Sequence, residues 1–401
     1  MDTRLRGANS AAMRQHNRAT VLRALLARGP MPRQELATIT GLRPSTITHV
    51  VRELIREGLV REVVSATAAP QDHPGRAPVP LEIAAEGALA LGVYLGGLAF
   101  EVGVVDLAGG VRVRASRRVA RGQPWQAVLG EVCDLAERLM VKVGTERLVG
   151  LGLASLGVVD PEEGEIEYAA FHSWRRAPVG QLVAARLGLP VVMENSARAM
   201  ALAEACYGAA RGAHSLVFVT VTEMVGAGAM IDGEIYRGRT GLAGEIGHTL
   251  AVPDGPLCDC GRHGCLEAVA STRALARMAG ELLGREAQPE EVLAGAAAGD
   301  PVCRRVVRTC LQPLAVAIAN LVDVLDPELV VLGGDILRAG SLPLEEICRV
   351  LEERDLLARG GFCPLVPSRL GGDVGLVGAG ALVLDPFVRA GGRLREGSFA
   401  G

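Results

Sequence analysis

The spacing of apolar residues near the amino terminus predicts three short helices. Apolar side chains recur at helical intervals through residues 13–28. A second helix is expected at 33–40, followed by Gly41, which can adopt the left-handed conformation of a turn. Apolar residues then recur every three or four positions through 45–57, behind Pro44, whose missing N–H costs nothing at a helix start. This succession predicts a helix-turn-helix.

Two apolar stretches after the third helix, 59–64 and 79–83, predict a pair of strands. They flank a loop rich in Gly and Pro that contains Arg76. A hairpin in this place is typical of a wing, from which Arg76 is expected to reach phosphate or the minor groove of DNA. We therefore assign residues 1–85 to a winged helix-turn-helix domain.

The third helix carries polar side chains opposite its apolar stripe and at its leading end. These candidate DNA contacts are Arg43, Ser45, Thr46, Thr48, His49 and Arg52. Short hydroxyls and Arg at the start of such a helix can contact base edges in the major groove. The alternative is a three-helix packing domain whose basic face is only solvated.

Charge is distributed unevenly along the 401 residues, whose formal net charge is −3. Residues 1–62 hold eleven Arg against five Asp or Glu, a net charge of +6 that leaves −9 on the remainder. A basic end on an acidic body indicates that one end contacts nucleic acid. The polar start of the chain and the lack of an apolar run of about 18 residues predict a cytoplasmic protein without membrane contact.

Two later parts of the chain repeat one order of elements, in which strands joined by Gly turns lead into helices. The strands are expected at 89–94, 100–106, 111–118, 215–222 and 225–231. The repetition predicts a duplicated α/β unit with a ligand cleft between its copies. We expect one lobe at 87–210 and another at 211–374, with a helix at 375–390 packing back on the first. The Gly-rich end after Arg389 is expected to be disordered.

A short segment broken by Gly concentrates metal-binding side chains. They are His248, Cys258, Cys260 and Cys265. Three Cys and one His fill a tetrahedral Zn²⁺ site, with Zn–S distances of about 2.3 Å, and leave no position for water, so the predicted zinc is structural. The alternative is a cluster of free cytosolic thiols.

Two carboxylates lie close to these ligands in sequence. Glu245 precedes His248 by three residues, and Glu267 follows Cys265 by two. Zinc would fix the two carboxylates relative to each other, and charged acceptors make strong hydrogen bonds to the adjacent hydroxyls of a sugar. The alternative is that both are ordinary groups around the metal or on the surface.

The sequences AGEIGH and CDCGRHGCLE resemble the signature of the ROK family, named for repressors, open reading frames and sugar kinases. The resemblance implies a two-lobed actin-like (ribonuclease-H-like) ATPase fold in which zinc is held by the His and three Cys. It also implies sugar contacts from Glu245, His248 and Glu267, together with Asn195 and Gly157. Asn195 has a second interpretation as the N-cap of the helix that follows it. Residues 1–85, including GANSAAMRQHNRATVLRALLARGP near the start, resemble the winged helix-turn-helix of ROK repressors, which plain ROK kinases lack.

The chain departs from the kinases of this family where phosphate is handled. Tyr94 and Leu98 stand where those enzymes carry the Asp and Thr of a phosphate loop, and Glu223 stands in the second phosphate loop. Ser196 replaces the catalytic Asp, and a serine has no useful basicity near neutral pH. Because each change opposes phosphoryl transfer, we expect no kinase activity.

The expected function is a sugar-responsive transcriptional regulator, a repressor of a carbohydrate-use operon. It would bind operator DNA as a homodimer or homotetramer and release it when a monosaccharide enters the interlobe cleft. One alternative is an ATP-dependent sugar kinase of the glucokinase type with a regulatory head. Another is a regulator controlled by a partner protein that docks near the zinc lobe.

Overall fold

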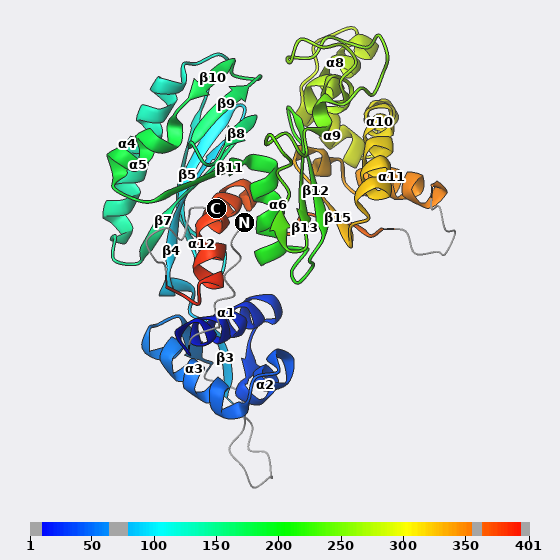
Figure 1. The fold of residues 1–401 in the computed structure, drawn as a ribbon. Coiled ribbons are helices and arrows are strands. Elements are labelled where there is room, and N and C mark those ends of the chain that lie inside the picture. Colours follow the sequence, from blue (N-terminus) through cyan, green and yellow to red (C-terminus); the bar gives the residue numbers. More distant parts are fainter. Residues whose placement is uncertain (1–9, 64–78, 355–362, 394–401) are drawn as a thin grey trace, which may run out of the picture.

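The computed structural model describes residues 10–63, 79–354 and 363–393. Figure 1 shows a small, mainly helical amino-terminal domain joined to two α/β lobes that stand side by side. Figure 1 also shows α12 (Val374–Arg389), near the end of the chain, between the first lobe and the amino-terminal domain. The α/β class predicted from the sequence is confirmed.

The amino-terminal domain has the three helices that the apolar spacing predicted. They are α1 (Ser10–Arg28), α2 (Arg33–Thr40) and α3 (Pro44–Arg56). Gly41 ends α2 with a φ of 67°, and Pro44 occupies the first turn of α3. A small sheet of order β1-β3-β2 completes the winged domain. Its strands are β1 (Met31–Pro32), β2 (Val60–Glu62) and β3 (Pro80–Ile83).

The first lobe is built on a mixed five-stranded sheet of order β11-β7-β4-β5-β6. The strands are β4 (Leu89–Leu95), β5 (Ala99–Asp106), β6 (Val111–Arg118), β7 (Leu148–Ser155) and β11 (Val191–Asn195). One core joins this sheet to α4 (Trp125–Val143) and α5 (Val179–Leu187). A second, small sheet lies at the cleft end of the lobe and contains β8 (Val158–Asp160), β9 (Glu165–Ala169) and β10 (Trp174–Ala177).

The second lobe repeats this plan with a sheet of order β14-β13-β12-β15-β16. Its strands are β12 (Leu216–Val221), β13 (Val225–Ile231), β14 (Glu234–Ile235), β15 (Leu329–Gly333) and β16 (Leu365–Pro367). Its helices are α7 (Leu266–Ala270), α8 (Thr272–Leu283), α9 (Pro289–Ala297), α10 (Pro301–Leu325) and α11 (Leu342–Glu353). In both sheets an antiparallel hairpin continues into parallel strands, so the duplication predicted from the sequence is present.

Two helices, α12 and α6 (Ser196–Tyr207), pack closely together beside the first sheet. Small residues permit this approach, since a Cβ on Gly378 in α12 would lie 2.7 Å from Ala199 O in α6. By length and composition alone, α10 and the stretch Gly371–Arg389 could each cross a membrane. Their apolar side chains nevertheless build protein cores, and 72% of the most apolar window in the second stretch is buried inside the protein.

The expectation of disorder after Arg389 is wrong for residues 390–393. These residues pack against the amino-terminal domain, where Gln15 Nε2 donates to Ala390 O at 3.0 Å and Arg18 Nε donates to Gly391 O at 2.7 Å. Glycine content alone was a poor guide, because Gly391 adopts the left-handed conformation that this docking requires.

Candidate functional site

The predicted zinc ligands form a compact group in the second lobe. One ligand atom from each of the four residues lies within 4.8 Å of all the others. Cys258 Sγ lies 3.6 Å from His248 Nδ1, and Cys260 Sγ lies 3.6 Å from Cys265 Sγ. A tetrahedral zinc ion separates its sulfur and nitrogen ligands by about 3.5–3.8 Å, so these residues fit a Zn²⁺ ion with no position left for water.

Local backbone turns bring the ligands together. Cys258 N donates to Arg262 O at 2.8 Å, and Gly261 N donates to Cys258 O at 2.9 Å, which closes a tight loop. Gly261 has a φ of 83°, in the left-handed region that favours glycine. Cys265 caps the start of α7, and His248 ends the short helix η2 (Ile246–His248).

The surroundings of the three thiols affect their pKa values differently. Burial raises the pKa of Cys258 and of Cys265. The pKa of Cys260 is lowered, although burial opposes this, because Arg262 hydrogen-bonds to its sulfur. A divalent cation stabilises several close thiolates by replacing their protons, which is how zinc binding couples to pH and to folding.

The two ring nitrogens of His248 face different groups. Its Nδ1 faces Cys258, whereas its Nε2 lies 3.9 Å from Glu245 Oε2. Burial lowers the pKa of His248, which favours the neutral imidazole that binds metals. With a metal on Nδ1, the ring proton resides on Nε2, where it can be donated toward the cleft.

The residues predicted to contact sugar line one cleft between the lobes. Gly157 and Asn195 come from the first lobe, and Glu245, His248 and Glu267 come from the second. The remaining walls are mostly apolar and include Leu156, Phe171, Met200, Met224 and Val225. Apolar walls with a few converging polar groups are typical of a small-molecule site.

The two carboxylates in the cleft differ in environment. Glu267 is buried, accepts the N–H of Val225 at 3.2 Å, and has its pKa raised to about 7, mainly by burial. Glu245 is partly open to the cleft, and burial also raises its pKa. Glu245 is therefore the carboxylate with more capacity to accept hydrogen bonds from a ligand.

Asn195 is both the predicted helix cap and a member of the cleft. Its Oδ1 accepts from the backbone N–H groups of Ala197 and Arg198, at 2.9 and 3.3 Å. Its Nδ2 donates to Gly157 O at 2.9 Å and lies 3.5 Å from Glu245 Oε1. Because its groups are already engaged, Asn195 positions its neighbours in this conformation more than it offers free groups.

A buried ion-pair network beside the cleft was missed by the sequence analysis. Glu194 and Arg198 are both fully buried, and Arg198 Nε donates to Glu194 Oε1 at 2.7 Å. Arg237 Nε donates to the other oxygen at 2.6 Å, and Arg198 also donates to Gly241 O and Ala243 O. The network fixes the backbone just before Glu245. The spacing of Glu194 and Arg198, four residues apart, was the available signal.

The turn after β4, which the sequence comparison with the family's kinases likened to a phosphate loop, is covered by side chains. A Cβ on Gly97 would lie 3.1 Å from Cγ of Glu223 and would overlap its carboxylate, so this side chain rests on the turn. The ring of Tyr94 packs against Gly375 in α12, and burial raises its pKa. Ser196 lines the cleft at the start of α6.

The polar face of α3 is largely open to solvent. Arg43, Ser45, Thr48 and Arg52 are exposed and Thr46 is half-buried. His49 is 64% exposed, and its Nε2 lies 3.0 Å from Glu53 Oε1. Arg76, the predicted wing contact, lies outside the described residues. The predicted DNA contacts outside the wing thus lie on α3 and at its start, and we call this surface the reading face. Glu53 lies on the buried side of the same helix.

Comparison with known proteins supports both parts of this description. A family model described as ROK family matches residues 90–386, and one described as MarR family matches residues 15–63. A xylose repressor of Caldicellulosiruptor bescii is 27% identical over 395 residues, which cover 95% of this chain and 98% of that protein.

Two solved structures extend the comparison. The crystal structure of a ROK family transcriptional regulator, a homologue of the E. coli Mlc protein, matches with a TM-score of 0.76 and 27% identity, covering 97% of this chain and all of that one. A ROK family glucokinase from Streptomyces griseus, in complex with glucose and AMPPNP, matches with a TM-score of 0.67 and 30% identity. That match covers 74% of this chain and all of the glucokinase. With its amino-terminal MarR-type winged helix and its two actin-like lobes, this chain belongs to the ROK family.

Proposed function

We propose that the protein is a sugar-responsive transcriptional repressor. The observation that carries the proposal is the combination in one chain of a winged helix with a cleft that gathers Glu245, His248 and Glu267 beside a zinc-type ligand group. The similarity to a xylose repressor and to a ROK transcriptional regulator over nearly the whole chain supports it.

In this proposal zinc is bound by His248, Cys258, Cys260 and Cys265 and supplies a rigid support for the cleft. Two neighbouring sugar hydroxyls donate to Glu245 and Glu267, while the Nε2 proton of His248 is donated to a sugar oxygen. Charged acceptors strengthen such bonds, and the apolar walls around them exclude water. The site therefore suits a monosaccharide.

The same cleft is poorly suited to phosphoryl transfer. The carboxylate of Glu223 rests on the Gly96–Gly97 turn, where it would repel a nucleotide phosphate. Ser196 offers no general base for the sugar hydroxyl. We therefore propose that the protein senses a sugar in the cytoplasm and does not phosphorylate it.

Operator binding is proposed to involve two copies of α3, because helix-turn-helix proteins read paired half-sites about one helical turn apart. This requires a homodimer or homotetramer. Arg43, Ser45, Thr46, Thr48, His49 and Arg52 are the proposed contacts, with Arg76 on the wing. Closure of the lobes on a monosaccharide would then alter the spacing of the two reading helices.

A thermal-shift screen of common monosaccharides on zinc-loaded protein tests the sugar site, since a ligand that binds the folded state raises Tm. Glu245→Gln is expected to abolish the shift. Glu281→Gln, on the exposed surface of α8, is the control and should keep it. The sugar proposal fails if no monosaccharide raises Tm or if Glu245→Gln responds like the control.

A further inference from the structure

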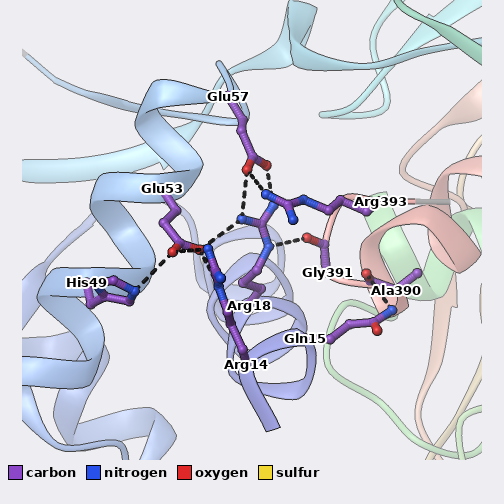
Figure 2. Close-up of polar contacts among 9 residues, drawn as sticks. All are labelled: Arg14, Gln15, Arg18, His49, Glu53, Glu57, Ala390, Gly391 and Arg393. Carbon is purple, nitrogen blue, oxygen red and sulfur yellow. Dashed lines mark hydrogen bonds and ion pairs between the residues drawn. The ribbon is translucent and has the colours of Figure 1, made fainter. Parts of the chain in front are cut away.

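The last described residues, 390–393, dock on the DNA-binding domain, and we call this segment the C-terminal brace. Figure 2 shows its contacts with α1 and α3. Gln15 donates to Ala390 O, Arg18 donates to Gly391 O, and Arg393 forms an ion pair with Glu57. These partners lie more than 330 residues apart in sequence, as between Glu57 and Arg393.

Arg18 is the centre of this contact. It is 2% exposed, and its guanidinium divides its bonds between the brace and α3. Nε donates to Gly391 O, while Nη1 lies 3.2 Å from Glu57 Oε1 and 3.4 Å from Glu53 Oε2. A buried charge is stable only while its hydrogen bonds are satisfied, so displacing the brace forces Arg18 to find new partners.

The polar contacts of Arg18 extend through Glu53 to the reading face of α3. Glu53 is almost fully buried, forms an ion pair with Arg14, and lies 3.0 Å from His49 Nε2 (Figure 2). His49 is one of the exposed candidates for DNA contact. A continuous set of polar contacts therefore links the brace, through Arg18 and Glu53, to the reading helix.

The residue directly before the brace is bonded to the second lobe. Arg389 Nη2 donates to Gly233 O at 2.7 Å, and Arg389 forms an ion pair with Glu234. Gly233 lies in the β13–β14 turn, and Glu234 begins β14. Arg389 also ends α12, which packs on α6, the helix that Asn195 caps at the cleft. The brace thus lies where the effector lobes and the DNA-binding domain meet.

We infer that Arg389 transmits the position of the second lobe to the C-terminal brace and, through the brace, to α3. This inference rests on the proposed function. Movement of the second lobe toward a bound sugar shifts the β13–β14 turn, and Arg389 carries that shift into residues 390–393. Arg18 and Glu53 then exchange their hydrogen-bond partners, and α3 loses the orientation that suits the operator. Arg18, Arg389 and Arg393 are positioning residues in this scheme.

Glycine makes the docking sterically specific. Gly391 has a φ of +68°, and a Cβ there would lie 2.8 Å from Gln15 O and 3.0 Å from Arg18 Cβ. Gly391→Ala should therefore displace the brace. Gly188→Ala is the matched control, because Gly188 has nearly the same φ, +66°, and no heavy atom among the described residues outside its immediate neighbours lies within 4 Å of an added Cβ.

The first experiment measures operator affinity of the full-length protein without sugar, using the duplex that the wild type selects from a random DNA library. Gly391→Ala is expected to weaken binding about tenfold relative to Gly188→Ala, equivalent to about 1.4 kcal/mol. Arg393→Gln, whose side chain is 55% exposed and whose loss should leave the domain folded, is expected to weaken it in the same direction. Wild-type operator affinity in both variants would overturn the inference that the brace supports DNA binding.

The second experiment repeats the titration with D-xylose and with D-glucose. The wild type is expected to lose operator affinity by about 5–150-fold with an effective sugar, the usual range of allosteric coupling. For Arg389→Gln the ratio of operator affinity without sugar to operator affinity with sugar should be much smaller than for the wild type. If Arg389 has a purely structural role, this ratio stays at the wild-type value. That result would overturn the inference that Arg389 transmits the position of the second lobe.

A wild type that releases the operator with neither D-xylose nor D-glucose would contradict control of DNA binding by these two sugars and, with it, the Arg389 link. The Gly391→Ala comparison would still decide whether the brace supports DNA binding, because it needs no sugar. The two failures are therefore distinguishable.

Discussion

Gly157 gives a sharp test of how the cleft is built. It has a φ of +79°, and its carbonyl accepts from Asn195 Nδ2 at 2.9 Å. A Cβ at this position would lie 2.8 Å from Cα of Ala169 and would overlap Tyr168 O, so Gly157→Ala must displace backbone atoms. Gly122 has nearly the same φ, +77°, but no described heavy atom outside its immediate neighbours lies within 4 Å of an added Cβ.

The difference between the two variants isolates the steric term. Each loses about 1–2 kcal/mol by placing an alanine in the left-handed region. Gly157→Ala should lose a further ~1–3 kcal/mol from overpacking. With a total stability of about 5–15 kcal/mol for a typical domain, both proteins stay folded. The shift of Gly157 also disturbs Asn195 and, through it, Glu245, so sugar affinity should fall about 10–100-fold, as expected for one charged hydrogen bond.

Urea unfolding of both variants measures the stability difference, and calorimetry with the most effective monosaccharide measures the affinity. The expected result is a lower midpoint and weaker sugar binding for Gly157→Ala than for Gly122→Ala. Equal midpoints and equal affinities would show that this close contact does not shape the cleft, and the reasoning would be refuted.

Three further outcomes are expected. Cys260→Ser should lower both the Tm and the zinc content measured by mass spectrometry, and full zinc content in the variant would contradict the ligand assignment. Chelation of the wild type should remove the sugar response until zinc is restored. The pKa of Glu53 is lowered, because hydrogen bonds and charge from Arg14 and Arg18 outweigh its burial. Its contribution to stability is therefore present above the unfolded pKa of about 4.3 and is lost as pH falls through the lower folded pKa. Glu53→Gln should reduce the loss of Tm in acid, and a Tm profile like that of the wild type would contradict this. Ser196→Asp should not create kinase activity with ATP and glucose, because Glu223 still covers the turn after β4, and ADP formation in a coupled assay would refute that explanation.

The features predicted well from the sequence depend on local spacing. The helices of the amino-terminal domain follow from apolar periodicity, with Gly41 and Pro44 at their junctions. The zinc ligands His248 to Cys265 lie within one short segment, so the chain has few ways to arrange them. Such features are encoded by residues that are neighbours in sequence.

The features that were missed depend on contacts between distant segments. Arg18 and Gly391 are separated by 373 residues, and neither is unusual in its own surroundings. A Gly-rich end normally indicates disorder, yet Gly391 is required there by its backbone conformation. For Asn195 the two interpretations, helix cap and cleft residue, are both met by the same side chain. Sequence spacing could not show this, because Gly157 comes from another part of the lobe.

The most direct test of the central claim is fluorescence anisotropy of a labelled operator bound to zinc-loaded, full-length protein during titration with monosaccharides. At least one monosaccharide is expected to release the wild-type protein, whereas Glu245→Gln should remain bound at the same concentration. Retention of the operator with every sugar tested, or equal release of Glu245→Gln, would contradict the claim that the interlobe cleft controls DNA binding.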